Sequence, residues 1–282
     1  MITQQQSLVS VIIPFLNGSH WLKEAIESVI SQSYPGWEVI LVDDGSEEEH
    51  SMIARDYSAK YPERIFYTDH PGHINRGVTI SRNLGIHLTK GLYIAFLDAD
   101  DCWLPQKLQN QLELFELHPE AGMICEASQF WYSWDNPSLE DVIVPVGAEP
   151  YRVYRPPELT YLLYPLGDGA PPCPSGIIIK REVFDRSGGF EESFTGIYQG
   201  YEDQALLGKI YLCENVFVSG HANNLYRKRN GSMSSFSGNE KLYNQVRRFF
   251  LDWLEVYLRE HSIKHAEVYR LIDKARYDMK DP

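Results

Sequence analysis

Carboxylates gather directly after two apolar runs in the N-terminal part of the chain. Asp98, Asp100 and Asp101 follow the run LYIAFL, and Asp43-Asp44-Gly45-Ser46 ends the run WEVILVD. Carboxylate oxygens are the ligands that Mg²⁺ and Mn²⁺ prefer, and such ions commonly keep part of their shell for substrate phosphates. Several carboxylates at the mouth of a buried strand raise one another's pKa unless a cation neutralises them. The spacing therefore predicts a divalent-cation site at Asp98 and Asp100, while Asp101 is expected to cap the following helix.

Two acidic pairs have a structural and a functional interpretation. Taken alone, Asp43-Asp44 followed by Gly45-Ser46 is typical of a turn that caps a helix. If this turn ends a strand of the same sheet, its carboxylates share a crevice with Asp98 and can accept hydrogen bonds from a base or ribose. For Glu202-Asp203, the pattern alone favours two stabilising charges at a helix N-terminus. The alternative is that this pair supplies a general base.

Strand and helix patterns alternate four times in the residues that carry these acids. Continuous β-branched runs predict strands covered on both faces, and apolar residues at three- and four-residue spacing predict helices between them. This order implies right-handed crossovers and an α/β fold, a Rossmann-type, mostly parallel sheet flanked by helices. Ligands of such sheets bind outside the carboxyl ends of the strands. The expected strands are 8–15, 37–43, 64–67 and 92–97, with helices near 19–32, 46–61 and 75–89.

The expected helix starts have their own signals. Ser19 is expected to cap the first helix, and Ser46 and Glu49 stand at capping-box spacing at the start of the second. After residue 101 the pattern is less regular. It predicts a helix at 105–119, a strand at 176–180 and a helix at 201–212, with a long connection at 136–174.

Composition excludes several classes of protein. The 282 residues carry 26 Lys+Arg against 39 Asp+Glu, a net charge of −13, so nucleic acid is not expected as the main partner. No uncharged apolar run approaches the roughly 18 residues of a membrane span. The start MITQQQS lacks the features of a secretory signal, and the four cysteines form no C-x-x-C pair. We therefore expect a cytoplasmic protein with reduced thiols.

Five motifs, in order along residues 8–212, resemble those of the family 2 glycosyltransferases with the GT-A fold. They are VSVIIPFLN, SQSYPGWEVILVDDGS, SRNLGI, GLYIAFLDADD with Trp103, Pro105 and Lys107 after it, and GYEDQALLGK. The resemblance implies transfer of a sugar from a nucleotide diphosphate sugar, expected to be UDP-linked, to an acceptor hydroxyl. It also implies inversion at the sugar and a Mn²⁺ or Mg²⁺ cofactor.

The resemblance assigns roles to individual residues. An acceptor hydroxyl must lose its proton as it attacks, and a cation can stabilise the leaving diphosphate, so one base and one metal are required. By resemblance, Pro14, Phe15 and Asn17 would line the nucleotide pocket, Asp44 would contact the base, Asp98 would lie near the ribose, Asp100 would bind the metal and Asp203 would be the base.

Basic residues are the expected partners of the diphosphate. Arg82 is expected either to contact the nucleotide or to form an ion pair on a helix surface. The segment HANNLYRKRNGSMSS resembles the family's late loop Y-R-x-H-x-x-S, with Arg229 at the histidine position. Arg227, Lys228 and Arg229 therefore remain expected charge partners of the diphosphate. His70 and His73 are expected to lie in a solvated turn.

These assignments divide the chain. We expect a GT-A-like domain at residues 1–228, with a nucleotide-binding half at about 8–101 and an acceptor half at about 102–228. Residues 229–282 are expected to form a linker, near 229–238, and a C-terminal helical extension. That extension would pack on the domain or form a homodimer; the alternative is peripheral contact with the inner face of a membrane.

Two other functions compete with a glycosyltransferase. The first is a nucleotide-sugar binding protein without activity, that is, a degenerate transferase. The second is a nucleotidyltransferase, which would need a glycine-rich, basic phosphate loop after the first strand. The sequence FLNGSHW has one glycine and no Lys or Arg there, so the second is disfavoured.

Overall fold

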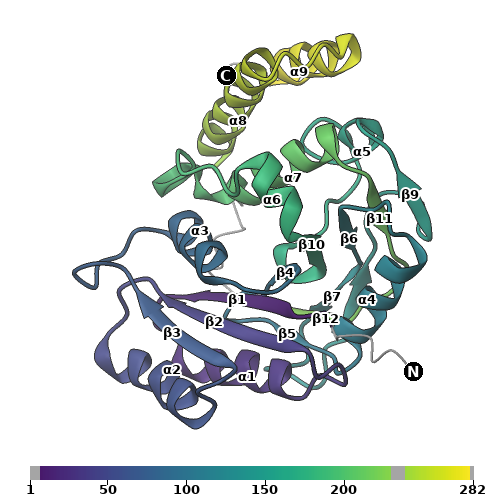
Figure 1. The fold of residues 1–282 in the computed structure, drawn as a ribbon. Coiled ribbons are helices and arrows are strands. Elements are labelled where there is room, and N and C mark those ends of the chain that lie inside the picture. Colours follow the sequence, from purple (N-terminus) through teal and green to yellow (C-terminus); the bar gives the residue numbers. More distant parts are fainter. Residues whose placement is uncertain (1–6, 230–238, 280–282) are drawn as a thin grey trace.

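An eight-stranded sheet forms the centre of the computed structural model, which describes residues 7–229 and 239–279 (Figure 1). Its strand order is β3-β2-β1-β4-β10-β6-β11-β9. The strands are β1 (Val9–Phe15), β2 (Trp37–Asp43), β3 (Ile65–Asp69), β4 (Tyr93–Phe96), β6 (Met123–Cys125), β9 (Arg152–Tyr154), β10 (Ile177–Lys180) and β11 (Val216–Val218). The α/β sheet flanked by helices that the sequence predicts is confirmed.

The first four strands form the parallel part of the sheet. β1 pairs in parallel with β2 and β4, and β2 pairs in parallel with β3. The crossovers contain α1 (Ser19–Ile30), α2 (Glu48–Lys60) and α3 (Val78–Leu88). The register aligns Phe15 with Asp43 and Asp43 with Asp69, so these strands end at one edge. Beyond β4 the sheet is mixed, because β10 runs antiparallel to both β4 and β6.

A second, four-stranded sheet lies in the C-terminal half, in the order β5-β12-β7-β8. Its strands are β5 (Cys102–Trp103), β7 (Ser128–Trp131), β8 (Val142–Val144) and β12 (Asn224–Arg227). The predicted connection at 136–174 contains β8, β9 and α5 (Glu158–Leu162), and a 3-10 helix, η1 (Pro174–Gly176), follows it. Sequence pattern did not separate these short strands, because three to four residues carry too little periodicity.

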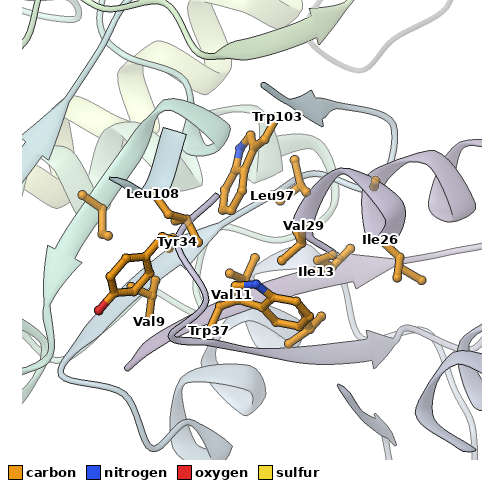
Figure 2. Close-up of a cluster of buried hydrophobic side chains, with 14 of the residues drawn as sticks. Val9, Val11, Ile13, Ile26, Val29, Tyr34, Trp37, Leu97, Trp103 and Leu108 are labelled. Atoms are coloured by element: carbon orange, nitrogen blue, oxygen red, sulfur yellow. The ribbon is translucent and has the colours of Figure 1, made fainter. Parts of the chain in front are cut away.

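Apolar side chains cover both faces of the main sheet, as the β-branched runs predict. On one face Val11 and Ile13 lie beside Val29 and Ile26 of α1, and Val9 lies beside Tyr34 in the same cluster (Figure 2). The α4 helix (Lys107–Leu117) contributes to the same cluster. The opposite face packs against α6 (Arg181–Ser187) and α7 (Glu202–Cys213).

Three helix starts differ from the predictions. α1 begins at Ser19, with Gly18 at the N-cap position. Ser46 forms no capping box, because α2 begins at Glu48 and the Ser46 hydroxyl instead accepts the Asn17 N–H at 2.8 Å. α3 begins at Val78 rather than near residue 75, since the preceding backbone forms a loop around Asp44.

The C-terminal helices α8 (Glu240–Glu260) and α9 (Ala266–Asp278) pack on the C-terminal half of the domain (Figure 1, yellow). Apolar residues of α8 join a third core cluster with Phe194 and Tyr201, beside the 3-10 helix η2 (Gly196–Tyr201) and the start of α7. The predicted packing on the domain is confirmed, while the homodimer stays a prediction. Most of the predicted linker lies outside the described residues. Within the described residues, every helix is too short or too polar to cross a membrane.

We expect Phe250→Ala to lower the free energy of unfolding by about 3–5 kcal/mol, because it empties a buried aromatic site. Phe250 is 1% exposed, and its ring lies 5.6 Å from the ring of Tyr201. The matched control is Val256→Ala on the same helix, where the side chain is 48% exposed and the change should be within about 0.5 kcal/mol. Urea unfolding measures both, and equal small changes would contradict the docking of α8.

Candidate functional site

A cavity of about 980 Å³ lies at the carboxyl ends of the parallel strands. Pro14, Phe15 and Asn17 at the end of β1 line it, as do residues that follow β2 and β4. The start of α7 lines the same cavity, although it is distant along the chain. The structure thus brings together the four predicted acids of the site, Asp44, Asp98, Asp100 and Asp203. Their individual roles stay predictions.

Asp44 is held by the loop that precedes α3. It is 5% exposed and accepts backbone N–H groups from Arg76 at 2.7 Å and from Gly77 at 3.0 and 3.1 Å. The imidazole of His70 lies 3.4 Å away, is 4% exposed and bonds the Ser81 hydroxyl. The predicted solvated turn is therefore wrong for His70, which supports the wall of the cavity.

Asp43 and Gly45 fix the turn that carries Asp44. The Asp43 carboxylate is buried and accepts the Ser46 N–H at 2.8 Å and the Tyr67 hydroxyl at 3.0 Å. Burial and this carboxylate raise the pKa of Tyr67 to about 12. Gly45 has φ +83, and a Cβ there would lie 2.7 Å from the Asn75 nitrogen. A side chain at residue 45 would therefore push the loop away from Asp44.

Arg82 of α3 joins two acids of the cavity wall. Its guanidinium donates to Asp98 at 2.7 Å and to Glu202 at 2.8 Å. The Arg82 side chain is only 3% exposed. The predicted ion pair therefore exists, but it is buried and not on a helix surface. Burial raises the pKa of Glu202, and Arg82 opposes that rise.

Asp203 is partly buried at the start of α7. The backbone N–H and the side-chain amide of Gln204 donate to its two oxygens at 2.7 and 3.2 Å. Burial raises the pKa of Asp203 to about 7, and the neighbouring charge of Glu202 adds to the rise. Arg82 and the bonds from Gln204 oppose it. A carboxyl group with this pKa can take up or release a proton near neutral pH.

Asp100 pairs with Arg229 on the cavity wall. The Arg229 Nε and Nη2 atoms lie 3.0 and 2.7 Å from one Asp100 oxygen, and the guanidinium lies 4.7 Å from the centre of the Trp21 ring. Arg229, at the position where the family loop has histidine, therefore brings a positive charge to the predicted metal ligand.

Arg227 does not line the cavity. Its side chain is 2% exposed, pairs with Glu24 and donates to the Asp100 carbonyl at 2.7 Å. In a strand, successive side chains point to opposite faces, so Arg227 points away from the face that carries Tyr226. The expected diphosphate contact is therefore not placed at Arg227, whose role in this structure is to hold the segment around Asp100.

Asp101 is not the predicted helix cap, because α4 begins at Lys107 and its N-cap position is Gln106. The Asp101 carboxylate is 2% exposed and accepts the Ser175 hydroxyl at 2.6 Å and the Arg227 N–H at 3.0 Å. Burial raises its pKa well above the ordinary value, and the charges of Asp98 and Asp100 add to the effect.

Sequence reasoning missed several residues of the cavity wall. Glu126 is fully buried, and one of its oxygens lies 3.3 Å from the ammonium of Lys107, which is also fully buried. Lys107 belongs to the motif that follows LDADD, and it is the residue from which Glu126 could have been sought. A buried lysine needs an acidic or polar partner. Phe130, Val144, Val146 and Tyr226 also line the cavity. Their strands or connecting segments are too short for the sequence to predict which side chains point into the cavity.

Comparisons with known proteins agree with this architecture. The protein-family model "Glycosyl transferase family 2" matches residues 10–188, and "Glycosyltransferase like family 2" matches residues 158–260. The putative teichuronic acid biosynthesis glycosyltransferase TuaG of Bacillus subtilis is 40% identical over 114 residues, which is 40% of this chain and 43% of TuaG. The chain thus spans less than half of that relative.

Solved structures share the fold. TarS 1-349 of S. aureus in complex with UDP-GlcNAc superposes with a TM-score of 0.69 at 19% identity, covering 95% of this chain and 71% of that one. The mannosyltransferase PcManGT of Pyrobaculum calidifontis in complex with GDP-Man and Mn²⁺ gives 0.63 at 16% identity, covering 98% and 70%. These neighbours confirm the expected GT-A-like fold. Because the first family model matches more than half of the 282 residues, the chain belongs to glycosyl transferase family 2.

Proposed function

We propose that this chain transfers a sugar from a nucleotide diphosphate sugar, expected to be UDP-linked, to an acceptor hydroxyl with inversion at the sugar. The observation that carries the proposal is that Asp203, with its pKa raised to about 7, lines the same cavity as Asp44, Asp98 and Asp100. The ligands of two structures with the same fold support a nucleotide-sugar donor, since TarS 1-349 binds UDP-GlcNAc and PcManGT binds GDP-Man.

Asp203 is the proposed general base. Its carboxylate would accept the proton of the acceptor hydroxyl as that oxygen attacks the anomeric carbon. The second acid of the pair, Glu202, is engaged with Arg82 at 2.8 Å, so one carboxylate remains for proton transfer. With one base, the acceptor oxygen would displace the diphosphate directly, without a covalent enzyme intermediate. A single displacement of this kind inverts the configuration of the sugar.

Asp98 and Asp100 fit a divalent cation by their chemistry. Both line the cavity with side chains about a quarter exposed (27% and 28%), and in the described part of the chain one oxygen of each has no hydrogen-bond partner. We propose that Asp100 holds Mn²⁺ or Mg²⁺ and that Asp98 lies beside it, near the ribose. When bound, such an ion stabilises the negative charge of the leaving diphosphate as a Lewis acid.

Outside the cavity, the described residues include one group of acids and histidine that could hold an ion. Glu47, Glu49 and His50 lie close together at the start of α2, and they do not line the cavity. Exposed acidic groups are common without a metal, and this group has no substrate cavity beside it. It therefore serves as a control for the proposed metal site.

Several other residues of the site are proposed to bind and orient the donor or to support its binding site. Pro14, Phe15, Asn17 and Asp44 are proposed to contact the nucleotide, as the family resemblance implies. Arg82 is proposed to hold Asp98 and Glu202 in place from behind the wall, and Arg229 is proposed to contact the diphosphate from the side of Asp100. A binding protein without activity would bind the same donor, but it would not need a carboxyl group whose pKa is raised to about 7.

We expect Asp203→Asn to lower turnover by about 10²–10⁴ and to leave UDP affinity nearly unchanged, because the amide cannot accept the proton. Release of UDP from a donor sugar and calorimetric titration with UDP measure the two effects. The matched control is Asp56→Asn on the exposed face of α2, which should change neither. Loss of UDP affinity in Asp203→Asn would mean a structural role.

The pH dependence of kcat/KM tests the same group. The base is active only when deprotonated, so a pKa raised to about 7 predicts that kcat/KM rises with pH and levels off above about pH 7. Gln204→Met removes the side-chain bond that lowers this pKa, so it should move the rise to higher pH. A profile that is flat down to pH 5 would contradict the assignment.

We expect Asp100→Asn to abolish the effect of Mn²⁺ on UDP binding, because a neutral amide is a weaker ligand for a hard cation. Calorimetric titration with UDP, with and without Mn²⁺, measures the effect. Glu49→Gln alters the exposed acidic group at α2 and should keep the full Mn²⁺ dependence. An unchanged Mn²⁺ dependence in Asp100→Asn, or its loss in Glu49→Gln, would exclude the proposed metal site.

A further inference from the structure

Strands of the second, four-stranded sheet form one wall of the cavity, and the proposed function assigns no role to this wall. Phe130 of β7 and Tyr226 of β12 are register partners in a parallel pair, so they lie on the same face. Their ring centres are 5.2 Å apart with an interplanar angle of 34°. Val144 of β8 lines the cavity beside them. Together, Phe130, Val144 and Tyr226 form an apolar surface, which we call the aromatic wall.

Lys228 follows β12 and lies over this wall. Its ammonium is 4.6 Å from the centre of the Phe130 ring and 5.2 Å from that of Tyr226. These distances fit cation–π contacts, which hold the charge at the ring faces and leave the ammonium hydrogens available to other partners. Lys228 is partly buried and lines the cavity.

Lys228 differs from the other basic residues that line the cavity. Three basic residues line the cavity, and two of them are neutralised, since Arg82 pairs with Asp98 and Glu202 and Arg229 pairs with Asp100. Across the residues the structure describes, Lys228 forms no ion pair. In a chain with a net charge of −13, a partly buried cation without a carboxylate is available to bind an anionic group of a ligand.

We propose that the aromatic wall and Lys228 bind the acceptor, and that this acceptor is a sugar carrying a phosphate or carboxylate group. The inference rests on the proposed function and names its acceptor class. The ring faces of Phe130 and Tyr226 pack against the C–H face of the sugar, and Lys228 forms a charge-assisted hydrogen bond with the anionic group.

The placement of Lys228 favours the acceptor over the donor diphosphate. The diphosphate has its own proposed partners at Asp100 and Arg229, whose charges face each other at 2.7 Å. Lys228 instead lies over the rings of Phe130 and Tyr226, and the apolar residues Val144, Val146 and Pro171 line the same cavity. A sugar bound at this wall shares the cavity with Asp203, the proposed base for its hydroxyl.

The test uses three probes with the same ring: glucose, glucuronate and glucose 6-phosphate. Each is titrated calorimetrically into the full chain, with UDP and Mn²⁺ present and again without them. The variants are Lys228→Met, which removes the charge and keeps the length, and Lys60→Met as a matched control. Lys60 also lies over two rings, those of Tyr57 and Tyr61 at 6.0 and 5.1 Å, but it is on α2, outside the cavity.

We expect at least one anionic probe to bind about tenfold more tightly than glucose, the gain of one charged hydrogen bond. Preference for glucose 6-phosphate or for glucuronate identifies the anion as phosphate or carboxylate. Lys228→Met should remove the preference and keep UDP affinity, and Lys60→Met should keep both. Phe130→Leu should weaken all three probes while preserving their order.

Two results would overturn the inference. The first is an absence of preference for both anionic probes in the unmodified chain, including the case in which no probe binds. The second is a loss of UDP affinity in Lys228→Met, which would make Lys228 a donor ligand. Failure of the unmodified chain to bind any nucleotide is a separate result, and it would contradict the proposed function itself.

Discussion

The buried guanidinium of Arg82 holds the two halves of the site together. It bonds Asp98 at the end of β4 and Glu202 at the start of α7, which are over a hundred residues apart in the chain. Removing one partner of a buried ion pair costs about 3–5 kcal/mol, because the other charge is left uncompensated. This side chain therefore holds the chain segment of Asp98 close to the start of α7, which also carries Asp203.

The same interaction sets the protonation of Asp203. Burial and the charge of Glu202 raise its pKa, and Arg82 and the bonds from Gln204 hold that rise to about 7. Without Arg82, Glu202 would keep its repulsion and lose its counter-charge, so the Asp203 pKa would rise further and the carboxylate would be scarcer at neutral pH. Arg82 thus contributes both to the geometry of the site and to the pKa of Asp203, beside burial, Glu202 and Gln204.

The sequence predicted that Asp44 and Asp98 would lie at one cavity, because parallel strands end at one edge of their sheet. Asp44 and Asp98 follow β2 and β4, and their meeting needs only the strand order. It was harder to predict which side chains of a strand point into the cavity. Arg227 and Lys228 are neighbours in one basic run, but β-strand alternation buries Arg227 against Glu24 while Lys228 lines the cavity. His70 and Asp101 were misjudged because their partners, Ser81 and Ser175, are identified only by tertiary contacts.

The charges of the cavity wall explain why donor and acceptor need different partners. Among the residues that the structure describes, six carboxylates line the cavity against three basic side chains, two of which are already paired with acids. An anionic donor entering alone would meet net repulsion, so the proposed function requires a cation at Asp100 to offset the charge of the diphosphate. At the aromatic wall the local charge is positive, because the ammonium of Lys228 lies over the rings of Phe130 and Tyr226. Lys228 would therefore stabilise, without a metal, the anionic acceptor that we propose, and this difference in charge would favour separate positions for the two substrates.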